Sequence, residues 1–195
     1  MKVLAIGGSM REESNTNKLV KKIAEATGVE YEFLELKNLD IKPCTGCMKC
    51  MMNEGQCPID DDMVETYDKL MTADALIVGS PTYYLDVSAA VKALIDRSMA
   101  LNYRGIGPMA NEDMPWLGQH PLSGKLGVSV VTVAGAGHER ALESLRIWMA
   151  DCHCLELVAQ LAEPVGMGDV DDMPEVIQRA VDAGKKLGKA LMNRQ

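Results

Sequence analysis

The chain has 195 residues, a formal net charge of −8 and an apolar share of 47%. This length allows one domain to bury a core unaided, and the acidic balance argues against a nucleic-acid backbone as the main partner. No apolar run approaches the length of a membrane span. The short apolar start MKVLAIGG is typical of a first strand rather than a signal peptide. We therefore expect a single domain, 1–195, in the reducing cytoplasm.

Apolar stretches typical of buried strands alternate along the chain with amphipathic stretches typical of helices. Strands are predicted at 2–7, 30–36, 74–79, 125–134 and 154–160, and helices at 15–27, 60–72, 86–98, 138–151 and 174–193. This alternation predicts an α/β fold, a doubly wound five-stranded parallel sheet with helices on both faces. Two connections are long enough to suggest function: a cysteine-rich insert, 40–59, after the second strand, and the loop 99–124.

Three loops follow strands whose carboxyl ends share one edge of the predicted sheet, where ligands of such sheets bind. The first offers hydroxyls, an amide and a guanidinium beside a helix N-terminus, which suits an anion. The second offers flat side chains that could flank a planar ring, and the third exposes backbone amides between glycines. The candidate binding residues are Ser9, Arg11, Ser14, Asn15 and Thr16 in the first loop, Pro81, Tyr83 and Tyr84 in the second, and Gly135 and Gly137 in the third.

Each of these loops, taken alone, is also consistent with an ordinary strand-to-helix turn. The first matches neither the dinucleotide fingerprint nor the Walker loop. His138 stands at a predicted helix start, where a histidine is usually solvated or capping, and no acid–base triad is expected.

Four cysteines lie close together in CTGCMKCMMNEGQCP. Cys44, Cys47, Cys50 and Cys57 have the spacing C-x2-C-x2-C-x6-C, followed by proline. A reducing compartment disfavours disulfides, and successive x2 steps favour an iron–sulfur cluster over the paired knuckles of a zinc site. Structural zinc and free or redox-active thiols remain alternatives. Two further cysteines, 152 and 154, are expected to be core thiols at the start of the fifth strand.

The motifs, in their order along the chain, resemble the flavodoxin-like NAD(P)H-dependent FMN reductase superfamily. The resemblance rests on GSMREESNT after the first strand, SPTYY after the third and the DVSAAVKALIDR that follows, and it covers nearly the whole chain. It implies a flavodoxin-like FMN-binding domain. The first-loop residues would hold the FMN phosphate, residues 81–84 would line the isoalloxazine, and residues 134–137 would place amides near the polar edge of the ring.

Within that superfamily the cysteine segment resembles the compact motif of the iron–sulfur flavoproteins. The resemblance implies that Cys44, Cys47, Cys50 and Cys57 bind a [4Fe-4S] cluster. It implies electron transfer between a one-electron carrier such as ferredoxin and a two-electron partner, with NAD(P)H as a transient donor. It also implies a homodimer or homotetramer in which one subunit's cluster approaches another's flavin.

Two alternative functions stay open, and so does the role of one long loop. The chain could be an NAD(P)H-dependent FMN or quinone reductase without a cluster, or a pure electron carrier. The loop 99–124, with Trp116, could cover the flavin, form an interface or pack on its own side chains.

Overall fold

The computed structural model describes residues 1–104, 120–153 and 155–194. Within these residues five parallel strands form one sheet in the order β2-β1-β3-β4-β5. The strands are β1 (Lys2–Gly7), β2 (Glu30–Glu35), β3 (Ala75–Pro81), β4 (Leu126–Val133) and β5 (Glu156–Pro164). The central strands β3 and β4 are buried at every residue, as their continuous apolar runs require when helices cover both faces. Strand order reverses between β1 and β3, which is where sheets of this kind bind ligands.

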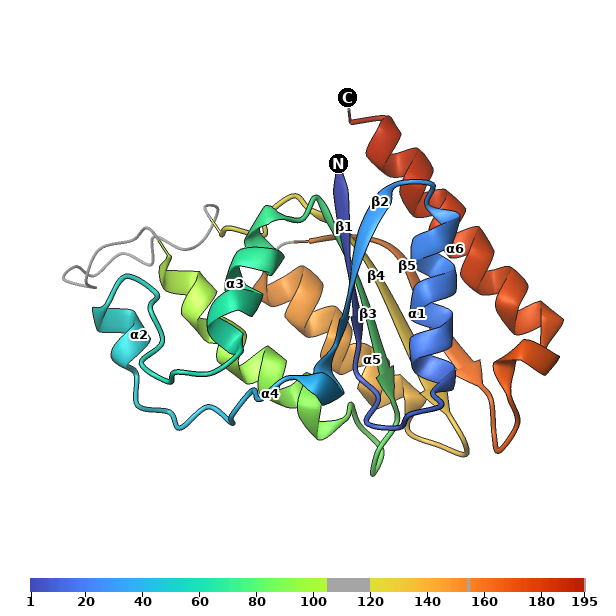
Figure 1. Cartoon of the computed structure of the whole chain (residues 1–195), viewed down its shortest axis with the longest axis horizontal. Coiled ribbons are helices and arrows are strands. Elements are labelled where there is room, and N and C mark those ends of the chain that lie inside the picture. Colours follow the sequence, from blue (N-terminus) through green and yellow to red (C-terminus); the bar gives the residue numbers. More distant parts are fainter. Residues whose placement is uncertain (105–119, 154, 195) are drawn as a thin grey trace.

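Helices cover both faces of the sheet (Figure 1), which confirms the doubly wound fold predicted from the sequence. One face carries α1 (Asn15–Ala26) and α6 (Pro174–Met192), and the other carries α3 (Met63–Thr72), α4 (Ala89–Arg97) and α5 (His138–Arg146). Each face has its own apolar core. The short elements are η1 (Leu36–Asn38), α2 (Lys49–Met52), η2 (Ser98–Tyr103), the π-helix η3 (Ile147–Cys152) and η4 (Val170–Asp172).

Three predicted details were wrong. Helix α3 begins at Met63 rather than residue 60, because Asp61 is occupied in hydrogen bonds outside the helix. Strand β5 runs from Glu156 to Pro164, later and longer than predicted. Cys152 is therefore not a core thiol on a strand: it ends η3 and is exposed, whereas residue 154 lies outside the described residues.

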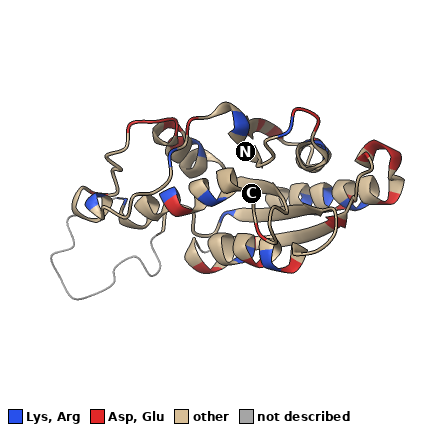
Figure 2. Cartoon of the chain, turned by 90° about the horizontal axis from the view of Figure 1, so that it is seen from below, with Lys and Arg blue, Asp and Glu red and all other residues tan. Residues whose placement is uncertain are grey.

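The cysteine-rich insert lies at one end of the molecule, around α2 and beside α3 and α4 (Figure 1). Of the long connection 99–124, residues 99–103 continue η2 from the end of α4, and Trp116 lies outside the described residues. Lys and Arg are scattered over the described molecule rather than gathered on one face (Figure 2). Among the described helices, none combines the length and apolar character needed to cross a bilayer.

Candidate functional site

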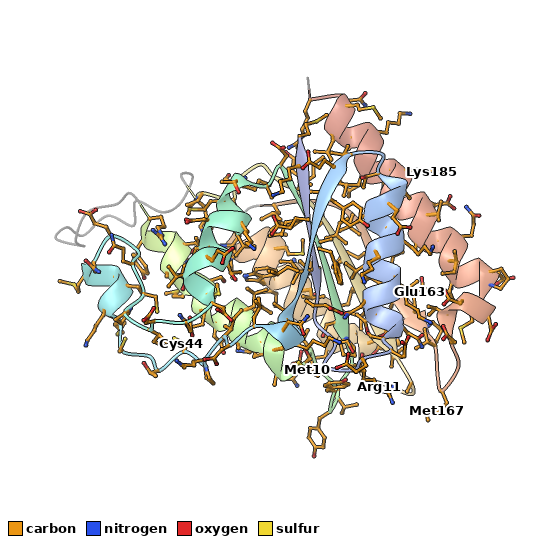
Figure 3. The ribbon with its side chains drawn as sticks, in the orientation of Figure 1. Met10, Arg11, Cys44, Glu163, Met167 and Lys185 are labelled. Atoms are coloured by element: carbon orange, nitrogen blue, oxygen red, sulfur yellow. The ribbon has the colours of Figure 1, made fainter. Side chains whose placement is uncertain are left out.

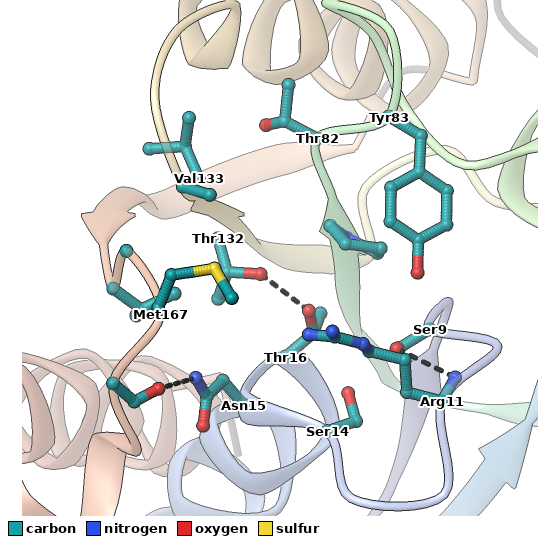
Figure 4. A pocket seen from close by; sticks show the side chains of 15 residues that line it. Ser9, Arg11, Ser14, Asn15, Thr16, Thr82, Tyr83, Thr132, Val133 and Met167 are labelled. Carbon is teal, nitrogen blue, oxygen red and sulfur yellow. Dashed lines mark hydrogen bonds between the residues drawn. The ribbon is translucent and has the colours of Figure 1, made fainter.

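Two cavities carry the residues singled out from the sequence, and they lie apart. Arg11 and Met167 mark the first, at the carboxyl edge of the sheet, and Cys44 marks the second, in the cysteine segment (Figure 3). The first cavity, shown in Figure 4, has a volume of about 140 Å3. It is lined by Ser9, Arg11, Ser14, Asn15, Thr16, Pro81, Thr82, Tyr83, Thr132, Val133, Ala134, Val165, Gly166, Met167 and Gly168.

The start of α1 gives this cavity the character of an anion site. Ser14 is the N-cap, and its Oγ accepts a hydrogen bond from the Asn17 N–H at 3.1 Å. The first N–H groups of a helix have no intrahelical partner, and the helix dipole favours negative charge there. Arg11 reaches the same cavity and forms no ion pair with any described residue. A phosphate would therefore meet one free guanidinium, backbone donors and hydroxyls.

Asn15 lines the cavity and also connects two loops around it. Its Nδ2 donates to the Gly168 carbonyl at 2.7 Å, and its Oδ1 accepts from the Val170 N–H at 3.1 Å. Lys18 reinforces this contact by donating to both Asp169 and Asp171. The Asn15 side chain thus ties the segment after β5 to the start of α1, and its predicted role in binding a phosphate stays a prediction.

Three threonines deeper in the cavity differ in whether their hydroxyls have hydrogen-bond partners. Thr16 and Thr132 share a hydrogen bond of 2.6 Å between their hydroxyls. The Oγ1 of Thr82 is buried and has no hydrogen-bond partner among the described residues. An unsatisfied buried hydroxyl costs roughly 1–3 kcal/mol, so Thr82 is the clearest sign in this cavity of a missing polar ligand atom.

The second loop forms a tight hairpin whose tip leaves the cavity. Tyr83 and Asp86 exchange backbone hydrogen bonds of 2.8 and 3.2 Å, and the two residues between them have positive φ. Tyr83 lines the cavity, but Tyr84 points into solvent and is 100% exposed. A positive φ at residues such as Tyr84 and Leu85 is strained by roughly 1–3 kcal/mol each.

The third loop contributes less to the cavity than predicted. Ala134 lines it, but Gly135, Ala136 and Gly137 do not. Gly137 has a φ of 94° and approaches the backbone of Leu85 so closely that an added Cβ would lie 2.5 Å from its Cα. Gly137 therefore allows both the close contact with the hairpin and the backbone conformation that begins α5. The binding roles expected for Tyr84 and residues 135–137 stay predictions.

The sequence reasoning missed a fourth loop, 165–168, which follows β5 and lines the cavity. Met167 in this loop is 94% exposed at the rim. The signal was available: β5 is parallel to its neighbours, so the segment after it must reach the same edge of the sheet as the other loops. His138 lies outside the cavity lining and pairs with Glu139 at 3.2 Å.

All four predicted cysteine ligands line the second cavity, which has a volume of about 190 Å3. That is far more than a single ion or water needs. Positive φ values at Gly46 and Gly55 allow the turns that bring the four residues to one space. As they stand, no three His, Cys, Asp or Glu side chains in the described residues are close enough to hold a metal ion. The donor set and the cavity size fit a multi-atom group, which would have to draw the sulfurs inward.

The thiols of this cavity experience different environments. Cys44 and Cys47 are exposed, whereas Cys50 and Cys57 are partly buried. The pKa of Cys47 is lowered, chiefly by a hydrogen bond from the backbone of Lys49. Burial raises the pKa of Cys50, and the neighbouring charges of Cys57 and Cys44 add to this effect. Cys57 and Cys44 therefore lie within electrostatic reach of Cys50.

A buried ion pair closes the base of the cysteine segment. Arg97 and Asp61 contact each other through two hydrogen bonds of 2.5 and 3.0 Å, and both side chains are fully buried. Burial opposes the charged form of Arg97, but the hydrogen bond that Arg97 donates to Asp61 and the neighbouring negative charges together outweigh burial and raise the pKa of the guanidinium. Tyr67 donates its hydroxyl to the Arg97 carbonyl at 2.8 Å. Neither member of this pair was predicted from the sequence, in which the signal was a charged residue at the end of the apolar face of α4.

This sheet order, with polar loops at the β1–β3 crossover, defines the flavodoxin-like class of α/β proteins. Solved structures support this class. A flavone reductase superposes with a TM-score of 0.72 at 18% identity, covering 97% of this chain and 62% of that chain. An NAD(P)H:quinone oxidoreductase from Methanothermobacter marburgensis superposes with a TM-score of 0.68 at 18% identity, covering 96% of each chain. At these identities the likeness shows the fold alone.

Residues 1–166 match the NADPH-dependent FMN reductase family, and the chain belongs to this family of flavin-dependent oxidoreductases. It is similar to an iron–sulfur flavoprotein of Methanosarcina thermophila, with 32% identity over 76% of this chain and 73% of the relative. An iron–sulfur flavoprotein of Methanocaldococcus jannaschii is 46% identical over 52% of this chain and 53% of the relative. The matched region thus spans only about half the length of some of these relatives. The resemblance to FMN reductases and iron–sulfur flavoproteins that was predicted from the sequence is confirmed.

Proposed function

We propose that this protein binds FMN at the carboxyl edge of its sheet and a [4Fe-4S] cluster at its four cysteines. In this role it transfers electrons between a one-electron carrier such as ferredoxin and a two-electron partner. The observation that carries the proposal is the convergence of Cys44, Cys47, Cys50 and Cys57 on one cavity in a chain of the FMN reductase family. The named relatives that are iron–sulfur flavoproteins support it.

The first cavity fits FMN in its chemistry. Arg11, the Ser9 and Ser14 hydroxyls and the free N–H groups at the start of α1 would hold the phosphate. Thr82 would supply a donor or acceptor to a polar atom of the flavin, and Tyr83 would pack beside the ring. A cavity of about 140 Å3 takes only part of so large a molecule. The exposed side chains at its rim, Met10 among them, offer apolar surface to the rest.

The two cofactors would divide the work: FMN exchanges electrons singly or in pairs, and a [4Fe-4S] cluster exchanges them singly. The chain's own contribution is to bind and orient them. Cys44 and Cys47 are exposed, so this edge of the cysteine segment is open to a redox partner. A reducing cytoplasm would keep all four thiols available as ligands.

The distance between the two cavities favours an oligomer. Cys44 lies in the left part of the molecule as seen in Figure 3, and Arg11 and Met167 lie along its lower edge, farther to the right. We propose a homodimer or homotetramer in which the cysteine segment of one copy faces the flavin cavity of another. NAD(P)H would then approach the flavin from the open rim near Tyr83 and Met167.

Anaerobic reconstitution with iron and sulfide, followed by metal analysis and a visible spectrum, tests this proposal. The wild-type protein should be brown and hold four irons per chain. The variant Cys47→Ser should lose most of that iron and still bind FMN, whereas Cys152→Ser, an exposed cysteine outside the cavity, should behave as wild type. Stoichiometric zinc without iron in the wild type would contradict the cluster.

A second function is compatible with the match of residues 1–166 to the NADPH-dependent FMN reductase family. In this alternative the protein is an NAD(P)H-dependent FMN or quinone reductase without a cluster. Such an enzyme should bleach its flavin with NAD(P)H and reduce quinone equally well as wild type and as Cys47→Ser. A cluster protein should lose electron transfer to ferredoxin in that variant.

Removing the buried hydroxyl of Thr82 tests the flavin site, because it should raise the stability of the apoprotein and weaken FMN binding. The isosteric change Thr82→Val removes an unsatisfied group, so the unfolding free energy of the apoprotein should rise by about 1 kcal/mol. FMN should bind about tenfold more weakly, because one hydrogen bond to the ligand is lost. Denaturation of the apoprotein and fluorescence titration with FMN measure the two effects.

Thr66→Val is the matched control, because the Thr66 hydroxyl donates to the Asp62 carbonyl in α3, away from the cavity. This variant should lose stability and bind FMN normally. Unchanged FMN affinity in Thr82→Val would remove Thr82 from the site.

A further inference from the structure

Arg97 is the last residue of α4, and its guanidinium is buried against the cavity that the four cysteines line. An arginine is rarely fully buried unless every donor is satisfied. Its two terminal nitrogens are satisfied. Nη1 donates to the Lys42 carbonyl at 2.9 Å and to Asp61, and Nη2 donates to Asp61 and to the Ile59 carbonyl at 3.5 Å.

These acceptors hold the two ends of the cysteine segment together. Lys42 precedes the first cysteine, and Ile59 follows the last. Asp61 adds to the closure, because its Oδ2 accepts the Lys42 N–H at 2.9 Å and its Oδ1 accepts the Met63 N–H at 3.1 Å. The pair therefore positions the segment relative to α3 and α4.

One donor of the guanidinium is left over. The Nε of Arg97 is buried and has no hydrogen-bond partner among the described residues. This N–H is not needed to hold the two ends of the cysteine segment together, because the four hydrogen bonds of Nη1 and Nη2 already do so. A cluster bound by four thiolates carries negative charge and offers sulfur acceptors, and hydrogen bonds to sulfur are among the factors that set its potential.

We propose that Arg97 is a positioning residue of the cysteine site whose Nε–H donates a hydrogen bond to a sulfur of the cluster and raises its reduction potential. This inference rests on the proposed cluster. The donor favours the reduced form, because that form carries one more negative charge and its sulfurs are stronger acceptors. Asp61 offsets much of the net charge of the guanidinium, so the directed N–H is the part of Arg97 that acts on the cluster.

Three variants separate this role from simple structural support. Arg97→Lys keeps a cation but loses the Nε–H. The pair Arg97→Gln with Asp61→Asn removes both charges and leaves no unpaired ion buried. Asp61→Asn alone keeps the Nε–H and removes the offsetting negative charge. The control, Arg179→Gln with Glu163→Gln, removes a comparable two-point ion pair away from the cysteines.

The readout is the midpoint potential of the reconstituted cluster, measured by electron paramagnetic resonance during anaerobic redox titration, with iron content and circular dichroism recorded for each variant. We expect a more negative potential in Arg97→Lys and in the double variant, a more positive one in Asp61→Asn, and no change in the control. The opposite signs of the two shifts in midpoint potential are decisive. If the pair were purely structural, Arg97→Lys and Asp61→Asn would shift the potential in the same direction.

The outcomes separate the two proposals. If the wild type holds four irons but Arg97→Lys and the double variant keep the wild-type potential, the role of Arg97 is overturned and the proposed function stands. If neither variant folds, the pair is structural and the inference is likewise overturned. If the wild type takes up no iron, the proposed function fails and this inference fails with it.

Discussion

Replacing Gly184 or Gly188 with alanine is expected to destabilise the protein by about 3 kcal/mol for each change. Both glycines lie on the face of α6 that packs against α1. A Cβ at Gly184 would lie 2.2 Å from the Ile23 carbonyl oxygen, and one at Gly188 would lie 2.1 Å from the Thr27 oxygen. Because both obstacles are backbone atoms, no rotamer change can relieve the overlap and the helices must separate.

The size of the effect exceeds what helix propensity can offset. Alanine is favoured over glycine inside a helix by roughly 1 kcal/mol, whereas overpacking in a closely packed interface costs 1–3 kcal/mol and occasionally more. Chemical denaturation of the apoprotein measures the difference. Gly135→Ala is the matched control, since its added Cβ meets no atom within 4 Å. A variant at Gly188 as stable as this control would show that the helices can move apart at little cost.

Lowering the pH from 7 to 5 is expected to destabilise the protein through two buried histidines. His120 and His153 contact each other, with 2.6 Å between the His120 Nε2 and the His153 Nδ1. The Leu122 N–H donates to the His120 Nδ1 at 3.1 Å, which places the hydrogen of the neutral ring on Nε2. That hydrogen faces two acceptors, the His153 Nδ1 and the Asn102 Oδ1.

The second ring is fixed in the same way. The Ser98 hydroxyl donates to the Ile95 carbonyl and accepts from the Trp148 Nε1–H, so it can only accept from the His153 Nε2. Both rings are therefore neutral, and a proton added to either Nδ1 would point at another donor. Burial lowers the pKa of His120 to about 4, and burial together with the charge of His120 lowers that of His153 to about 3.

The direction of the pH effect follows from these values. An unfolded histidine has a pKa of roughly 6.5, so between pH 6.5 and 4 the unfolded chain binds more protons than the folded chain. The contribution of the two neutral histidines to the unfolding free energy is complete above pH 6.5. It is lost as the pH falls, by about 2 kcal/mol per histidine at pH 5. Urea denaturation at pH 7 and pH 5 measures it.

The matched variants are His120→Gln with His153→Gln, and His138→Asn, which changes the histidine outside this pair. The double variant should be less stable at pH 7 but should lose less stability on acidification. The His138 variant should keep the wild-type pH dependence. If the double variant keeps the full dependence, the acid-sensitive groups lie elsewhere.

The architecture could be predicted from the sequence because its signals are local and repeated. Buried parallel strands need continuous apolar residues, and their alternation with amphipathic helices leaves few possible folds. The predicted fifth strand ended at residue 160, whereas β5 continues to Pro164 and includes the charged residue Glu163. In the structure Glu163 is 1% exposed and its carboxylate is held by Arg179, a contact that depends on α6 packing back onto the sheet.

The candidate site was predictable only in part, because contacts between distant segments leave no local signal in the sequence. Loop position predicted that Ser9, Arg11 and Thr82 would share one cavity, and cysteine spacing predicted the second cavity. What could not be predicted depends on contacts between distant segments. The hydrogen bonds between the Asn15 side chain and the loop after β5 are one example.

The closed base of the cysteine segment also bears on how the protein could gain and lose a metal group. The chain on either side of the four cysteines is tied together by Arg97 and Asp61 without any help from the sulfurs. Closing a loop of this size costs on the order of 2 kcal/mol in entropy, and here folding of the sheet meets that cost before any ligand arrives. We therefore expect binding and loss of the proposed cluster to change the order of the cysteine segment alone. This change should be separable from unfolding of the whole chain.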